Sequence, residues 1–327
     1  MTGLFAKDAR GILDLDGTLL FNAMAEANRL RELRHGQSIN LCWIINAKSG
    51  GCDQNCNFCS QSTQSTADIS EYDLIGSDEI VSAAEEASRN GAVRFSIVTS
   101  GGAVEEGREL ATILESVGRI ADETALNVCV SLGCVDRYVL AALRKAGVKR
   151  YHHNMETAES YWSRVCTTRT YEESRRVIRE AQEEGLEVCS GGIFGMGESL
   201  DQRIELLDEV KSLGVESVAI NFFVPIPGTP FAEIQPIAPL ECLKVVIAAR
   251  LMMPRRDIRV CGGREKNVRD LQSMLVTSGV SGLMIGGYLT TPGRSAQEDL
   301  AMIRDLGLTP DTIPQGRTTI TMNPDRR

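Results

Sequence analysis

Residues 51–63, Gly51-Cys52-Asp53-Gln54-Asn55-Cys56-Asn57-Phe58-Cys59-Ser60-Gln61-Ser62-Thr63, place three cysteines in a C-x3-C-x2-C pattern. Cysteine thiolates are the usual ligands of iron–sulfur clusters. Three of them can hold one face of a four-iron cube and leave the fourth iron open, as a reactive metal site requires. A structural zinc site or three unrelated buried thiols are the alternatives. Zinc needs a fourth Cys or His close by, and the nearest histidine in the sequence is His35.

This loop resembles the signature of the radical S-adenosylmethionine (SAM) enzymes. The resemblance implies a 4Fe–4S cluster on Cys52, Cys56 and Cys59, whose open iron binds the amino and carboxylate groups of SAM. It also implies that Phe58, directly before the third cysteine, packs against the adenine of SAM.

Composition excludes several classes of partner. The 327-residue chain has a net charge of −9 and no long basic run, so we expect neither nucleic acid nor a membrane as its partner. No apolar stretch approaches the ~18 residues of a membrane span, and residues 1–8 lack the apolar core of a signal peptide. We therefore expect a cytoplasmic protein whose ten cysteines are thiols and metal ligands rather than disulfides.

Residues 14–18, Asp-Leu-Asp-Gly-Thr, resemble the nucleophile motif of haloacid-dehalogenase-type phosphatases. That chemistry needs a hydrophobic strand before the first aspartate, and only two apolar residues precede Asp14. Apolar residues at helical spacing follow between positions 24 and 33. We therefore predict an acidic turn that caps an N-terminal helix ending near His35.

From residue 38 onward, short apolar segments alternate with amphipathic ones. The pattern predicts strands over 39–47, 93–99, 126–132, 148–154, 185–192, 216–224, 256–262 and 280–286. It predicts helices over 77–90, 105–122, 136–146, 171–184, 199–213, 238–250 and 265–278. Eight strand–helix units over ~250 residues are typical of a parallel (β/α)8 TIM barrel, with the site at the carboxyl ends of the strands. The predicted divisions are an N-terminal helical extension (1–36), the barrel with its C-terminal part (37–310) and a polar tail (311–327).

A second set of cysteines, Cys129, Cys189 and Cys261, falls in the third, fifth and seventh predicted strands. One register of each strand would point all three into the barrel, with Arg259 on the same face as Cys261. A buried guanidinium is costly unless it meets an anion or a metal site, so we predict a second cluster here. Small apolar core residues are the alternative. The other cysteines are interpreted as core or surface thiols: Cys42, Cys134, Cys166 and Cys242.

Further segments make the chain strongly similar to the biotin synthases over about residues 36–310. They are residues 151–157 (Tyr-His-His-Asn-Met-Glu-Thr), 167–171 (Thr-Thr-Arg-Thr-Tyr), 189–198 (Cys-Ser-Gly-Gly-Ile-Phe-Gly-Met-Gly-Glu), 220–221 with 227–230, and 259–265 (Arg-Val-Cys-Gly-Gly-Arg-Glu). The resemblance implies sulfur insertion into dethiobiotin at two unactivated C–H positions. A 5′-deoxyadenosyl radical from SAM abstracts hydrogen, an auxiliary iron–sulfur cluster supplies sulfur, and no side chain serves as acid or base. It also implies a homodimer and a flavodoxin or ferredoxin as the reductant.

Roles in binding are carried over by matching position. The resemblance puts Glu156 on the SAM ribose, and Gly191, Gly192 and Ile193 along SAM. Asn154 and Asn221 would hold the ureido group of dethiobiotin, and His152 stands where another asparagine is usual. Ser174 occupies the position of an arginine that meets the SAM carboxylate. Either Arg175 or Arg176 substitutes for that arginine, or the contact is lost in this chain.

The auxiliary cluster departs from the usual pattern of a 2Fe–2S cluster on three cysteines and an arginine. Cys129, Cys189 and Arg259 match that pattern, but Ser96 stands in place of the third cysteine, and Cys261 replaces a serine. We therefore favour a four-iron cluster that could carry an extra sulfide on its open iron. A 2Fe–2S cluster on Cys129, Cys189, Cys261 and Arg259 is the alternative.

Two other functions remain open. A relative of the hydrogenase-maturase or methylornithine-synthase type would share the barrel but act on a different small molecule. An electron-transfer module with two clusters would need neither Asn154 nor Asn221.

Overall fold

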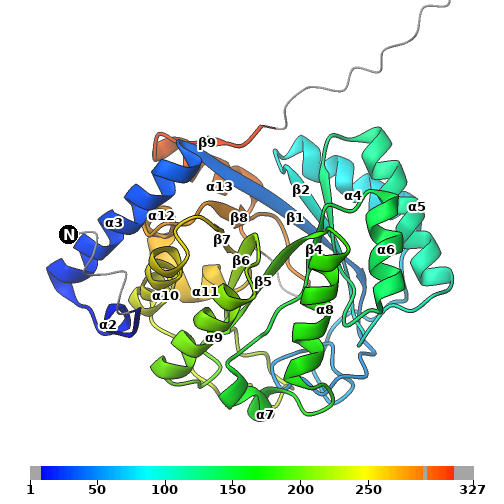
Figure 1. The fold of residues 1–327 in the computed structure, drawn as a ribbon, viewed down its shortest axis with the longest axis horizontal. Coiled ribbons are helices and arrows are strands. Elements are labelled where there is room, and N and C mark those ends of the chain that lie inside the picture. Colours follow the sequence, from blue (N-terminus) through cyan, green and yellow to red (C-terminus); the bar gives the residue numbers. More distant parts are fainter. Residues whose placement is uncertain (1–8, 290–292, 313–327) are drawn as a thin grey trace, which may run out of the picture.

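The computed structural model describes residues 9–289 and 293–312. In this part of the chain, the strands follow one another around a barrel in sequence order, and β1 closes it by pairing in parallel with both β8 and β2 (Figure 1). The strands are β1 (Ser38–Lys48), β2 (Arg94–Thr99), β3 (Asn127–Ser131), β4 (Arg150–His152), β5 (Glu187–Phe194), β6 (Ser217–Phe222), β7 (Asp257–Val260), β8 (Gly282–Met284) and β9 (Thr309–Pro310), a short addition to β1. The predicted (β/α)8 barrel is confirmed.

Helices surround this barrel on the outside (Figure 1). They are α2 (Ala9–Leu13), α3 (Gly17–His35), α4 (Ser77–Arg89), α5 (Arg108–Glu123), α6 (Arg137–Ala146), η1 (Glu159–Tyr161), α7 (Trp162–Val165), α8 (Tyr171–Glu183), α9 (Leu200–Ser212), α10 (Pro239–Met252), α11 (Arg264–Val268), η2 (Arg269–Leu271), α12 (Gln272–Thr277) and α13 (Ala296–Asp305). None of those in the described ranges is long and apolar enough to cross a membrane.

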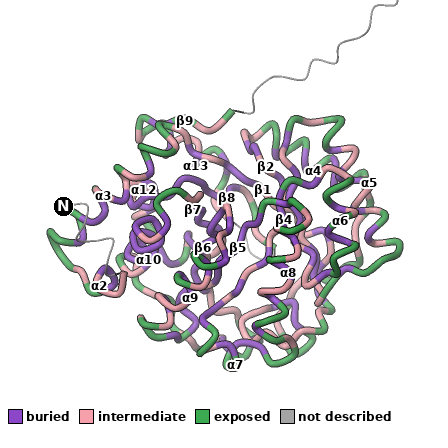
Figure 2. Tube along the Cα trace, viewed as in Figure 1, coloured by how far each residue is buried: buried purple, intermediate pink, exposed green. Residues whose placement is uncertain are grey.

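Side chains of each strand alternate between two environments. Along β2, Phe95 and Ile97 are fully buried against the helices, whereas Ser96 and Val98 line a cavity inside the barrel. The main apolar core therefore lies between sheet and helices, as the buried segments of Figure 2 show. The barrel interior is left available for a site.

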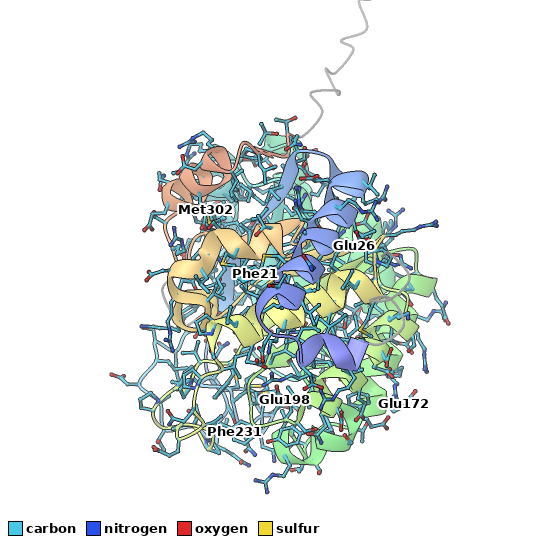
Figure 3. All side chains as sticks on the ribbon, turned by 90° about the vertical axis from the view of Figure 1, so that its left-hand side faces the viewer. Phe21, Glu26, Glu172, Glu198, Phe231 and Met302 are labelled. Atoms are coloured by element: carbon cyan, nitrogen blue, oxygen red, sulfur yellow. The ribbon has the colours of Figure 1, made fainter. Side chains whose placement is uncertain are left out.

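Helix α10 is buried on nearly all sides, from Cys242 to Leu251. Helices α2 and α3 lie across its outer face, as seen in Figure 3, which looks at this flank. A surface helix would carry a polar stripe, but the segment Val245-Val246-Ile247-Ala248-Ala249 has none. The N-terminal extension thus supplies the second apolar wall that this helix needs.

The aspartates of residues 14–18 have structural roles. Asp16 occupies the N-cap position of α3, but its side chain makes no capping hydrogen bond and instead accepts one from Lys244 Nζ at 3.2 Å. Asp14 pairs with Arg10 at 2.5 Å. The helix is confirmed and the side-chain cap is wrong. The described residues before Asp14 form α2 rather than the strand that a phosphatase nucleophile requires.

One predicted helix is broken. Residues 265–278 form α11, the turn η2 and α12, because Arg269 has a φ of 54°, which a helix cannot accommodate. The predicted tail falls almost entirely outside the described residues, since 313–327 are not described.

A buried ion pair holds the C-terminal part of the fold. Asp299 on α13 is fully buried and accepts hydrogen bonds from Arg264, which is also fully buried, and from Arg294 Nε at 3.1 Å. Removing one member of such a pair leaves uncompensated buried charge.

We expect Asp299→Ala to lower the free energy of unfolding by about 3–5 kcal/mol, because two guanidinium groups lose their anion. Urea unfolding followed by circular dichroism measures this change. Arg304→Ala, at an exposed position of the same helix, is the matched control and should change stability by less than about 0.5 kcal/mol. Equal midpoints for both variants would contradict the assigned role of the pair.

Candidate functional site

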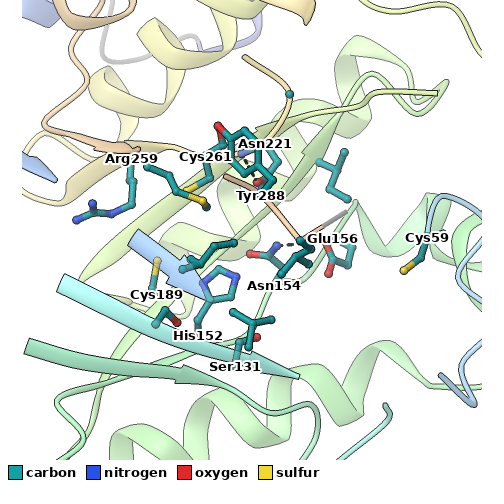
Figure 4. A pocket seen from close by; sticks show the side chains of 18 of the residues that line it. Cys59, Ser131, His152, Asn154, Glu156, Cys189, Asn221, Arg259, Cys261 and Tyr288 are labelled. Atoms are coloured by element: carbon teal, nitrogen blue, oxygen red, sulfur yellow. Dashed lines mark hydrogen bonds between the residues drawn. The ribbon is translucent and has the colours of Figure 1, made fainter. Parts of the chain in front are cut away.

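A cavity of about 350 Å³ lies inside the barrel. It brings together most of the residues that the sequence singled out, and Figure 4 shows many of them converging. The predicted site residues that line it are Phe58, Cys59, Cys129, His152, Asn154, Glu156, Cys189, Ile193, Asn221, Arg259 and Cys261. Cys52, Cys56, Gly191 and Gly192 stand beside the cavity in the same loop or strand, and Arg175 is elsewhere.

The three-cysteine loop follows β1 directly, at the carboxyl end of that strand. The amide of Cys52 donates to Gln61 O, and Thr63 N donates to Cys52 O, both at 3.0 Å. These bonds close the loop around its cysteines. Burial raises the pKa of the Cys59 thiol to about 11, so a metal that binds here must displace a proton.

Asn55 joins this loop to the segment before α8. Its side-chain Nδ2 donates to Thr167 Oγ1 at 2.6 Å, and its Oδ1 accepts from the amides of Thr167 and Thr168 at 2.9 and 3.1 Å. The amide of Asn55 in turn donates to Thr168 Oγ1 at 3.0 Å. The Thr-Thr-Arg segment is therefore fixed against the cysteine loop.

Glu156 is held in an uncommon backbone conformation, with a φ of 61°. Its carbonyl accepts from Ile193 N at 2.8 Å, and Oε2 of its side chain accepts from Asn154 Nδ2 at 3.2 Å. Burial raises the pKa of this carboxyl above its ordinary value, and the charge of Arg169 opposes that shift. Strain of this kind is found where a side chain must be aimed at a ligand.

The glycines of β5 make room for the protein's own backbone. A Cβ on Gly191 would lie 1.8 Å from Ala219 O, and one on Gly192 would lie 2.5 Å from Glu156 O. These glycines let β6 and the Glu156 segment close on β5, while Ile193 lines the cavity. The placement of Gly191 and Gly192 along SAM stays a prediction.

Four cysteines, not three, line the other part of the cavity. Cys42 on β1 lines it together with Cys129, Cys189 and Cys261. We had interpreted Cys42 as an ordinary core or surface thiol. It is buried, but its side chain lies on the inward face of β1, two residues before Ile44, which also lines the cavity. The alternation of inward and outward side chains along β1 predicts this inward position of Cys42.

Three arginines balance these thiols: Arg94, Arg150 and Arg259. Burial would lower the pKa of Arg259, but the neighbouring sulfurs of Cys42, Cys189 and Cys261 outweigh it and hold that pKa above its ordinary value. Arg259 also donates to the Asn40 side chain. The predicted proximity of Arg259 to the cysteines is thus seen directly.

His152 faces Cys189. Burial would raise the pKa of the Cys189 thiol, but the hydrogen bond with His152 and the charges of Arg150 and Arg259 lower it to about 6. The same hydrogen bond raises the pKa of His152 against the effect of its burial. A thiol prepared in this way ionises readily to bind metal. The sequence placed His152 at the substrate, and the structure gives it this second contact.

Two carboxamides project between the two groups of thiols. Asn154 Oδ1 is buried without a hydrogen-bond partner, which leaves an acceptor for a ligand N–H group. Asn221 Nδ2 donates to Gly192 O at 3.2 Å, and its Oδ1 accepts from Gly262 N at 2.9 Å. Asn221 thereby connects β5 to the loop after β7. The second N–H of its Nδ2 is left to donate to a ligand.

The expectation for Arg175 is wrong. Its guanidinium pairs with Glu209 at 2.7 Å and Glu159 at 2.8 Å, and it stacks on Tyr171 on the outer side of α8. A side chain engaged in this way cannot reach the cavity. Arg176 pairs with Glu180 at 2.8 Å.

The sequence matches the radical SAM superfamily over residues 47–210 and the biotin and thiamin synthesis associated domain over residues 219–309. The chain is 46% identical to a biotin synthase of Geotalea uraniireducens over 301 residues, which are 92% of each chain. It is 47% identical to one of Geobacter sulfurreducens over 302 residues, again 92% of each.

Solved structures show the same fold at lower identity. Methylornithine synthase superposes with a TM-score of 0.82 at 19% identity, covering 94% of both chains. An FeFe-hydrogenase maturase from Carboxydothermus hydrogenoformans gives 0.79 at 21% identity, covering 94% of this chain and 75% of that one.

We expect Gly192→Ala to lower the free energy of unfolding by about 1–3 kcal/mol, because the new methyl group would displace Glu156 or Leu206. Urea unfolding measures it. Gly118→Ala in α5 is the control. A Cβ there meets nothing within 4 Å, so that variant should gain about 0.5–1 kcal/mol from helix propensity. A Gly192→Ala protein as stable as the parent would disprove the close approach.

Proposed function

The chain belongs to the biotin synthase family of radical SAM enzymes and makes biotin from dethiobiotin, and we propose which of its residues carry each part of that reaction. When bound, SAM on its 4Fe–4S cluster supplies a 5′-deoxyadenosyl radical, and an auxiliary cluster supplies sulfur. The protein's task is to hold these groups close together and away from water.

The observation that carries the assignment is the arrangement inside one cavity. Cys59 lies on one side of the close-up view, Cys189 and Cys261 lie on the other, and Asn154 and Glu156 lie between them (Figure 4). A substrate held at Asn154 would then have the radical source on one side and the sulfur source on the other. Sulfur insertion needs that order.

The SAM side is assigned to the three-cysteine loop and its neighbours. Cys52, Cys56 and Cys59 would hold the cluster, and the Phe58 ring, which packs with Val165, Met196, Phe223 and Phe231, would lie against the adenine. Glu156 would accept hydrogen bonds from the ribose hydroxyls, an interaction that suits a buried carboxylate with unused acceptor capacity. Ile193 would close the apolar side of the same pocket.

The substrate side is assigned to the two carboxamides. The unpartnered Asn154 Oδ1 fits a ureido N–H group, and the remaining N–H of Asn221 fits the ureido carbonyl. His152 would fix the Cys189 ligand while its ring borders the substrate.

For the auxiliary cluster we favour four irons on Cys129, Cys189 and Cys261, with the fourth iron open for an extra sulfide. Arg94, Arg150 and Arg259 supply positive charge for a cluster of thiolates and sulfides. A 2Fe–2S cluster with Arg259 as its fourth ligand remains the alternative. A flavodoxin or ferredoxin reductant, a homodimer and a cytoplasmic location stay predictions.

Complementation tests the function. A bacterial biotin auxotroph that lacks its own sulfur-insertion enzyme should grow on dethiobiotin when it expresses this chain. Asn154→Ala should abolish growth at low dethiobiotin, because an unpaired ureido N–H costs about tenfold or more in affinity. Arg304→Ala is the control and should support normal growth. SAM cleavage without growth would point instead to a relative acting on another small molecule, as methylornithine synthase does.

Iron and sulfide analysis with Mössbauer spectroscopy tests the auxiliary cluster. Cys52/Cys56/Cys59→Ala protein, reconstituted without oxygen, should retain about four irons with surplus sulfide. Adding Cys261→Ser should remove most of this iron, whereas adding Cys42→Ser should not. A two-iron signal would contradict the four-iron cluster and support the 2Fe–2S alternative. Iron loss in the Cys42→Ser protein would make Cys42 the fourth ligand and contradict the open iron.

A further inference from the structure

The SAM side of the cavity lacks the cation that the resemblance places on α8. Ser174 occupies that position, is fully buried, and its hydroxyl has no hydrogen-bond partner. Arg175 is committed to glutamates on the outer side of the helix. Arg176 pairs with Glu180 and donates to Cys134 O at 3.5 Å. None of the three side chains on α8 is placed to neutralise a carboxylate beside the three-cysteine loop.

Arg169 comes from a different element, the segment that Asn55 fixes against that loop. The bonds of Asn55 to Thr168 hold the residue just before it. The indole Nε1 of Trp162 donates to Arg169 O at 2.9 Å and fixes the residue itself. The backbone of Arg169 is thus anchored on both sides, next to Cys56 in the folded chain.

The side chain of Arg169 is ordered by stacking rather than by an acid. Its Cζ lies 5.3 Å from the centroid of the Trp162 ring, which also packs edge-on against Tyr171. The Nε atom is buried without a hydrogen-bond partner, and Nη1 reaches only the Cys134 sulfur, at 4.0 Å. In the described part of the chain, no ion pair includes Arg169. Arg169 as a whole is half-buried, but its Nε has lost water without gaining a partner, so an anion at this guanidinium would be favourable.

Arg169 lies beside the three-cysteine loop. It directly follows Thr168, whose amide donates to Asn55 Oδ1 at 3.1 Å, and Asn55 directly precedes Cys56. The charge of Arg169 also opposes the rise in the pKa of Glu156 that burial causes. The guanidinium thus belongs to the segment that borders the loop assigned to the cluster.

We propose that Arg169 binds the carboxylate group of SAM and replaces the missing arginine at position 174. A guanidinium presents two parallel N–H groups that match a carboxylate, and its stacking on Trp162 keeps this fork oriented before the ligand arrives. The inference rests on the proposed function, because it assumes that SAM is bound at the three-cysteine loop.

Binding of SAM to the reconstituted holoenzyme, measured by equilibrium dialysis without dethiobiotin, tests the proposal independently of turnover. Arg169→Gln should weaken SAM binding about 10- to 100-fold, because a charge-assisted pair is lost. Arg169→Lys should recover part of this loss, since it keeps the charge but not the fork. Arg176→Gln removes a neighbouring arginine and is the matched control, with binding expected within about twofold of the parent.

SAM methyl ester separates recognition of the carboxylate from a general effect of charge. Esterification should weaken binding to the parent strongly and to Arg169→Gln much less, so that the two losses are not additive. Any loss of iron chelation by the ester is common to both proteins and cancels in this comparison.

Equal losses on esterification in both proteins would overturn the proposal. Iron counts guard against a structural effect. If Arg169→Gln fails to hold its cluster, the effect of esterification is measured on Arg169→Lys instead. If esterification weakens binding to Arg169→Lys as much as to the parent, Arg169 only offsets the charge of the thiolates and the proposal is overturned. A parent protein that holds its cluster but binds no SAM would refute the proposed function itself, a result distinct from any effect of position 169.

Discussion

A buried guanidinium is stable only beside groups that can offset its charge, and this requirement shapes the barrel interior. A barrel that needed only packing would fill its centre with Val, Ile and Leu. Here the inward positions instead carry four cysteines facing Arg94, Arg150 and Arg259. Each guanidinium would be costly alone. The charges of Arg150 and Arg259 help to lower the pKa of Cys189. Burial outweighs such charges at Cys129 and Cys261 and holds their pKa values above the ordinary range. The arginines and cysteines together line a cavity in the middle of an otherwise apolar fold. The helices outside the strands supply the stability that the interior does not.

The sequence predicted the architecture because period-two and period-3.6 patterns directly report which faces are buried. Each of the eight predicted strands is present, and the cysteine loop follows β1 as the location of barrel active sites requires. The same alternation placed Cys129, Cys189 and Cys261 inward. The same alternation puts Cys42 on the inward face of β1, beside the cavity. Alternation along a strand involves only neighbouring residues, so it predicts which side chains face inward without knowledge of the fold.

Contacts distant in sequence could not be read in that way. Arg175 does not reach the cavity, because its side chain points to glutamates of η1, α8 and α9. The position of Arg169 depends on Asn55, more than a hundred residues away. The glycines of β5 illustrate the same limit. The sequence indicates that something approaches these glycines closely. Only the structure shows that the approaching groups are the backbones of Ala219 and Glu156.

The tie between Asn55 and Thr168 spans 113 residues, and closure of the barrel by Leu41 and Leu283 spans most of the chain. A chain that folds while it leaves the ribosome makes its cysteine loop long before either partner exists. The three-cysteine loop gains its last contacts only after β6 has emerged, because Phe231 N donates to Asn57 O and Phe58 packs against Phe223. The deeper four-thiol site is complete only when β7 and β8 have closed on β1. The cavity is therefore assembled in order along the chain, with the surroundings of the three-cysteine loop complete before those of the four thiols.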